Sequence, residues 1–154
     1  VHLAVNLFVL YSFGQGVELY FKQLEVEGML QFPSLWYAFL YLSALFVSSI
    51  TTLRKHRNDF SYSAVGASGA VSAVLFAYIL FEPWKLIFVF FIPVPAIIFA
   101  ILYVGYSIWS GKRGNSNINH SAHLWGAAYG VIMTIIIEPR VIPHFLNKLM
   151  QLPF

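Results

Sequence analysis

The sequence predicts an all-α fold, a bundle of helices that cross a lipid bilayer. The 154-residue chain is 59% hydrophobic and only 10% charged, whereas a soluble domain carries about 25% charged residues. Five long stretches lack Asp, Glu, Lys and Arg, and each approaches or exceeds the roughly 17–25 residues that a helix needs to cross a bilayer. Their apolar residues are continuous rather than alternating, which favours helices over the strands of a membrane barrel.

Composition also excludes several classes of function. The net charge of +3 is small and scattered along the chain, which argues against nucleic acid as a partner. The chain has no Cys, so it offers no thiolate or disulfide chemistry, and we expect neither a metal nor a cofactor. Aromatic residues make up 18% of the chain, in keeping with Trp and Tyr belts at membrane surfaces. The lipid bilayer is therefore the first partner that the sequence indicates.

We expect one domain, residues 1–154, containing five membrane helices. The first, at about residues 1–20, carries His2 and Asn6 four residues apart on one face. The second, at about residues 36–53, has no ionisable side chain and is interpreted as a structural helix that faces lipid. A charged loop follows each of these two helices.

The third helix is expected at about residues 66–81, with small residues at its start. A short amphipathic turn then leads to the fourth helix, expected at about residues 86–110. Pro93 and Pro95 lie in this stretch. Each removes a backbone donor, so we expect a kink within the fourth helix.

The fifth helix is expected at about residues 120–137, followed by a polar, amphipathic tail at residues 138–154. The first, third and fifth helices run parallel, because the second and fourth lie between them in the chain. Lys and Arg are balanced between the two sets of loops, so the positive-inside rule indicates no orientation. Val1 lies inside an apolar run without a Met before it, and we expect the chain to be a piece of a longer protein with at least one more helix.

Four polar side chains within the apolar stretches fall at one depth. Each lies 12 to 16 positions before the acidic residue that follows it, namely Glu18, Glu82 or Glu138. At a rise of about 1.5 Å per residue the four span about 6 Å in depth. Polar groups inside a membrane are functional candidates by default. The four residues are His2, Asn6, Ser68 and His123.

Small residues predict close packing between the third and fifth helices. Gly66 and Gly69 each precede an Ala by four positions, and Gly126 and Gly130 repeat this spacing on the fifth helix. Such spacing places small residues on one face and lets two helix backbones approach closely. The second pair shares the face of His123, so this packing would bring its ring within reach of a hydroxyl on the third helix.

These residue types are those of an acyl-transfer site. The Ser68 hydroxyl becomes a nucleophile when a base takes its proton, and the His123 imidazole is such a base. The developing oxyanion needs hydrogen-bond donors, which His2, Asn6 and the Ser68 backbone N–H could supply. No Asp or Glu lies at this depth, so the catalytic unit would be a Ser–His dyad rather than a triad.

Each of these residues also has a structural interpretation. A Ser in a membrane helix often bonds its own backbone or permits close packing, and His or Asn can join helices by hydrogen bonds. The agreement of four such residues in depth, beside small-residue faces, favours a site. Three other histidines are set apart. His120 lies one turn nearer the surface, where the interface suits it, and His56 and His144 fall outside the apolar spans and are expected to be solvated.

At these residues the sequence resembles the rhomboid family of intramembrane serine proteases. Three motifs carry the resemblance: Gly66-Ala67-Ser68-Gly69, Ala122-His123 with Gly126 and Gly130, and His2 with Asn6 four positions later. The resemblance covers nearly the whole chain. It implies that the five helices stand for the second to sixth of six, so that the first transmembrane helix and a loop would be missing here.

The resemblance also implies an activity. Ser68 would be the nucleophile and His123 the general base of a serine endopeptidase, and His2, Asn6 and the Ser68 amide would form the oxyanion hole. The substrates would be transmembrane proteins, cut in or near their membrane segment. The site would open toward the extracytoplasmic side of the cell membrane, plasma or inner. The kinked fourth helix would serve as a lateral gate for the substrate.

One position departs from the family pattern. Many members carry a Tyr four residues after the nucleophile, packed against the catalytic His, and here that position is Ser72. His123 would then be held by Trp125 or by an aromatic residue of another helix.

Two other functions remain open from the sequence. A non-catalytic relative would bind membrane clients, although such relatives generally lack the Ser or the His. A transporter or channel subunit would need polar residues across the full depth, and the first, third and fifth helices are apolar below the site. No feature of the sequence indicates an oligomeric state.

Overall fold

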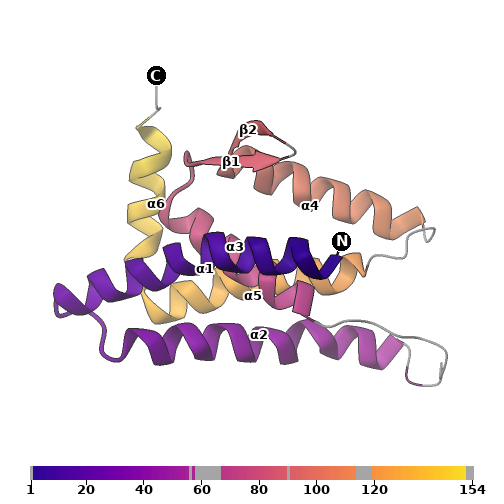
Figure 1. Cartoon of the computed structure of the whole chain (residues 1–154), viewed down its shortest axis with the longest axis horizontal. Coiled ribbons are helices and arrows are strands. Elements are labelled where there is room, and N and C mark those ends of the chain that lie inside the picture. The colour runs from indigo at the N-terminus through magenta and orange to yellow at the C-terminus, as the bar shows by residue number, and fades with distance from the viewer. Residues whose placement is uncertain (1, 56, 58–66, 90, 114–118, 152–154) are drawn as a thin grey trace.

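The computed structural model describes residues 2–55, 57, 67–89, 91–113 and 119–151, and the prediction of a mostly helical chain is confirmed for this part. Helices α1, α2, α3 and α5 lie side by side as a bundle, α6 stands across one end of it, and the β-hairpin and α4 lie along one side (Figure 1). The elements in order are α1 His2–Val26, α2 Pro33–Lys55, α3 Ala67–Phe81, β1 Leu86–Val89, β2 Ile92–Pro95, α4 Ala96–Arg113, α5 His120–Ile137 and α6 Val141–Met150.

Residues 86–89 and 92–95 pair as the two strands of a β-hairpin, so the prediction of one kinked helix over residues 86–110 is wrong at its start. Strands β1 and β2 pair antiparallel, with Leu86 opposite Pro95 and Phe88 opposite Pro93. Aromatic and β-branched residues dominate this stretch and favour strands. Each Pro lacks the N–H that a helix interior requires but is tolerated at a sheet edge. The helix α4 therefore starts only at Ala96.

Two other boundaries differ from the prediction. Helix α1 continues to Val26, six residues past the end predicted at about residue 20. The tail after α5 contains a further helix, α6. The α1 extension carries Lys22 and Glu25, and Lys22 forms an ion pair at 2.8 Å with Glu18, one turn earlier in the helix. Pairs of this kind, four residues apart, support an exposed helical turn.

Helix α3 is the core of the bundle. Every residue from Ser68 to Phe81 is buried except Tyr78, which is half-buried. The helix packs against α1, α2, α4, α5 and α6. A helix that is apolar on all sides is typical of such a central position. The residues of α3 are therefore positioned by neighbours on every side.

Helix α2 instead presents one apolar face to the outside. Leu35, Phe39, Leu42 and Phe46 are all exposed, and their spacing of four, three and four residues places them on one side of the helix. In water such a stripe would be costly, whereas lipid tails are its natural solvent. The outward face of α2 is thus suited to a bilayer.

Two helices of the described chain are long and apolar enough to cross a membrane, over Pro33–Ile50 and His120–Ile137. The apolar helices Ala67–Phe81 and Ala96–Gly111 are shorter. The 15 residues of α3 extend about 22 Å, against a hydrocarbon layer of about 30 Å. Five spanning helices therefore stay a prediction, of which two are supported by length and composition.

Polar contacts at the end of α3 fasten α1 and α6 to it. The Lys148 ammonium of α6 lies 2.6 Å from the Glu82 carboxylate, and the Tyr20 hydroxyl of α1 donates to the same group. His144 Nε2 donates to the Phe81 carbonyl at 2.9 Å. His144, expected to be solvated, is therefore half-buried and bonded to α3, because α6 folds back against that helix.

The same contacts set the ionisation of Glu82. Partial burial alone would raise its pKa, but the hydrogen bonds from Lys148 and Tyr20 and the charge of Lys148 hold the pKa of Glu82 below its ordinary value. The ionised carboxylate thus contributes to the attachment of α6 at neutral pH.

We expect Lys148→Met to lower the midpoint of thermal unfolding in detergent at pH 7. The ion pair is partly exposed, so the loss should be about 0.2–1 kcal/mol. Because the pKa of Glu82 is depressed in the folded state, the pair stabilises above the unfolded value of 4.5 and is lost as pH falls through the folded value. The difference from wild type should shrink below about pH 4. A difference that persists unchanged at lower pH would mean that the ion pair is not its source, and Lys85→Met serves as the matched control.

Candidate active site

Helices α3 and α5 touch backbone to backbone. A Cβ added to Gly126 would lie 1.9 Å from the Gly69 carbonyl oxygen, and one added to Gly130 would lie 2.2 Å from the Ala73 carbonyl oxygen. Real Cβ atoms do not approach other atoms this closely, so neither glycine can be replaced without moving a helix. The contacts fix how far α5 can slide along α3. Gly66, also predicted to pack here, lies outside the described residues.

This contact brings the surroundings of Ser68 and His123 together. A Cβ on Gly69, the residue after Ser68, would lie 2.9 Å from the carbonyl oxygen of Ala122, the residue before His123. Ser68 is the second residue of α3 and is 9% exposed. Its backbone N–H belongs to the first turn, whose donors have no partner within the helix and lie at the positive end of the helix dipole.

A chain of contacts joins the two residues through α4. The Ser72 hydroxyl donates to the Ser68 carbonyl at 3.0 Å and lies 2.6 Å from the Tyr103 hydroxyl. The Tyr103 ring stacks on the His123 ring, with centroids 6.1 Å apart and planes 21° from parallel. Trp125, the other aromatic residue considered for this role, is half exposed on the outside of α5. The aromatic neighbour of His123 therefore comes from another helix.

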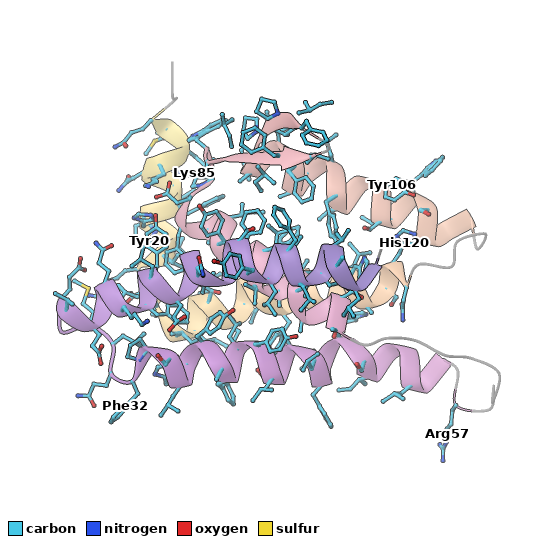
Figure 2. The ribbon with its side chains drawn as sticks, viewed as in Figure 1. Tyr20, Phe32, Arg57, Lys85, Tyr106 and His120 are labelled. Atoms are coloured by element: carbon cyan, nitrogen blue, oxygen red, sulfur yellow. The ribbon has the colours of Figure 1, made fainter. Side chains whose placement is uncertain are left out.

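A second Ser–His pair lies at the same end of the molecule. Ser110 Oγ and His120 Nε2 share a hydrogen bond of 2.9 Å, and both residues are buried, at 8% and 5% exposure. The Tyr106 ring packs edge-on against the His120 ring, with centroids 5.6 Å apart; both residues are labelled in Figure 2. The His120 ring also lies 6.4 Å from that of His123.

His120, expected one turn nearer the membrane surface than His123, is buried inside the protein, and its depth in the membrane stays a prediction. The N-terminal turn of α5 places it beside α4, where Ser110 supplies the hydrogen bond. The side chain of Asn119 fixes this turn by accepting a hydrogen bond from the Ala122 N–H at 3.1 Å. The pairing links two helices, and no local pattern around Ser110 could have indicated it.

The two predicted oxyanion donors lie on α1. Asn6 is half-buried, whereas the side chain of His2 lies outside the described part of the structure. The bond from Tyr20 to Glu82 aligns α1 with α3. Asn6 precedes Tyr20 by 14 positions, as Ser68 precedes Glu82 by 14. Since α1 and α3 run parallel (Figure 1), Asn6 and Ser68 lie at about the same height.

The site thus combines a hydroxyl at the N-terminus of a helix, an oriented imidazole and an amide side chain at one end of the bundle. Such a set can carry nucleophilic acyl transfer. In the described part of the chain, no three His, Cys, Asp or Glu residues are placed so as to hold a metal ion.

Comparison with known proteins gives two matches. A model of the rhomboid domain matches residues 1–140. RHOMBOID-like protein 12, mitochondrial, from Arabidopsis thaliana is 32% identical over 136 residues, which cover 85% of this chain and 40% of that protein. The chain thus spans less than half the length of this curated relative. No solved structure matches.

We expect Gly126→Ala to destabilise the protein strongly, because the new methyl group would meet backbone atoms of α3. Overpacking usually costs about 1–3 kcal/mol, and a clash with backbone should reach the upper end. Gly105→Ala on α4 is the matched control, since a Cβ there meets nothing within 4 Å; it should be neutral or stabilising by up to about 1 kcal/mol. Thermal unfolding in detergent measures both, and equal midpoints for the two variants would refute the backbone contact.

Proposed function

The chain belongs to the rhomboid family, and from this premise we propose that it is an intramembrane serine endopeptidase that hydrolyses transmembrane proteins. Ser68 is the proposed nucleophile and His123 the proposed general base. The observation that carries the proposal is the contact of the first turn of α3 with the first turns of α5, which brings the surroundings of the two residues together.

The position of Ser68 within its helix supports it over Ser110. Both serines are buried, and the Ser110 hydroxyl shares a hydrogen bond with His120. Ser68 opens α3, where free N–H groups and the positive end of the helix dipole favour an oxyanion. Ser110 lies in the last turn of α4, where the free groups are carbonyls and the dipole is negative. An oxyanion beside Ser110 would be destabilised.

The proposed reaction follows from these roles. As Ser68 Oγ bonds to the scissile carbonyl carbon, His123 takes the hydroxyl proton, and the carbonyl oxygen becomes an oxyanion. The Ser68 N–H and the side chains of Asn6 and His2 are its proposed donors. His123 then gives the proton to the leaving amine, and an acyl-enzyme remains. Water attacks the acyl carbon while His123 takes its proton and returns it to Ser68 Oγ, which releases the carboxyl product.

The proposed substrates are transmembrane proteins that reach the site from the lipid. Within the described chain, α4 packs against α3, α5 and the hairpin and against no other element. It therefore lies at the margin of the bundle, with Ile101, Leu102 and Trp109 exposed toward the outside. These features support the interpretation of α4 as the lateral gate.

We further propose that the site opens toward the extracytoplasmic side of the cell membrane. The relative from Arabidopsis thaliana is named as mitochondrial, so fractionation should compare the cell membrane with mitochondrial membranes. Protease protection of tags at the two ends of the protein would then report the orientation.

We expect a fluorophosphonate probe to label Ser68 in the full-length, membrane-extracted protein. Ser68→Ala and His123→Ala should abolish labelling and cleavage of a single-pass substrate with a helix-destabilised membrane segment. Asn6→Ala should reduce turnover about 10²–10³-fold, as the loss of other oxyanion donors does. Ser110→Ala is the matched control and should keep both activities.

Peptide mapping of the adduct separates the outcomes. An adduct at Ser110 would mean that the nucleophile is Ser110 of the second Ser–His pair and not Ser68. The alternative outcome is a folded protein that is neither labelled nor active but binds membrane clients, and binds them equally well when it carries Ser68→Ala. That outcome would show that the protein is a client-binding relative and not a protease.

A further inference from the structure

We propose that Tyr103 is a positioning residue that orients the His123 imidazole, and that Ser72 holds Tyr103 in place. This inference rests on the proposed function and deepens it. It assigns to α4 a part of the machinery that none of the three sequence motifs contains.

The stacking geometry restricts the imidazole. The two rings lie 21° from parallel with centroids 6.1 Å apart, so Tyr103 limits rotation of the His123 ring out of its plane. The π-face of a tyrosine also attracts a cation. It therefore favours the imidazolium that forms when His123 takes the proton from Ser68.

The hydroxyl of Tyr103 is fixed at the far end of its ring. Ser72 is buried, at 4% exposure, and its hydroxyl has one hydrogen, which it donates to the Ser68 carbonyl. Tyr103 must therefore donate the hydrogen of the 2.6 Å contact between the two hydroxyls. The phenol is thus tied to the helical turn that carries the nucleophile.

Neighbouring rings hold Tyr103 from other sides. Its centroid lies 5.6 Å from that of Phe76 on α3 and 5.7 Å from that of Phe99 on α4. A phenylalanine at position 103 could make all these ring contacts. The hydroxyl, which is costly to bury without a partner, is satisfied by Ser72. The paired hydroxyls therefore specify one position of the ring.

The test compares kcat and KM for cleavage of a transmembrane substrate by the full-length protein. Tyr103→Leu should lower kcat about 10²-fold, as misplacement of a catalytic group by about 1 Å can do, while KM changes little. Tyr103→Phe and Ser72→Ala should each lower kcat by a smaller factor. The two combined should cost no more than either alone, because they remove the same hydrogen bond. Tyr106→Leu, one turn along α4, is the matched control and should leave kcat within about threefold.

A rescue separates positioning from packing. Tyr103→Ser should behave as Tyr103→Leu does, and adding Ser72→Tyr should restore kcat at least about tenfold. The exchange moves the ring to α3 and fills the same space, because the two hydroxyls are in contact. If Tyr103→Leu lowers the unfolding midpoint but leaves kcat unchanged, or if the exchange restores stability alone, the positioning role is overturned.

A readout without turnover separates this inference from the proposed function. In a Ser68→Ala background, the His123 ring protons should show a ring-current shift that Tyr103→Leu removes and Tyr103→Phe keeps. If Tyr103→Leu removes this shift but the protein with Ser68 intact never cleaves a substrate, the proposed protease is refuted and the orientation of the imidazole by Tyr103 stands. A spectrum that Tyr103→Leu does not change would refute the positioning itself.

Discussion

The backbone contact between α3 and α5 is the constraint on which the rest of the structure depends. In lipid no hydrophobic force drives helices together, so close packing and hydrogen bonds must do so. Gly69, Gly126 and Gly130 allow an approach that no larger residue permits. The same contact sets the level of His123 relative to Ser68. A change that stabilised the bundle by separating these helices would therefore disturb the site.

In the described part of the chain, the polar side-chain contacts of α3 gather at its two ends. At its start lie the backbone N–H of Ser68 and the paired hydroxyls of Ser72 and Tyr103. At its other end Glu82 joins α1 and α6 to the helix. The turns between them are apolar and buried. This separation lets the distal end be held by charge, whereas near Ser68, within the described residues, hydroxyl and carbonyl groups bond to one another.

Local patterns in the sequence predict part of this arrangement. The bounds of α5 and the packing of its glycines against α3 could be predicted from the sequence, because a helix repeats its contacts every three to four residues. The hairpin at 86–95 could not, since a continuous apolar run suits a buried helix and a strand alike. The two Pro residues predict a kink, but in the structure they lie in the hairpin and the helix begins after them. The contact of Ser72 with Tyr103 spans 31 positions, and the Ser110–His120 bond joins two helices, so neither leaves a periodic signal.

The ring stacked on His123 comes from α4 and not from α3, which couples its position to any movement of α4. A tyrosine on α3 would move with the proposed nucleophile, and the proposed base would keep its support whatever α4 did. Here Tyr103 belongs to α4, which packs only against α3, α5 and the hairpin within the described chain. If Tyr103 positions His123, any movement of α4 that admits a substrate also withdraws the support of the base. Chemistry would then require α4 to return against α3 with the substrate in place, so the gate and the base would act as one element.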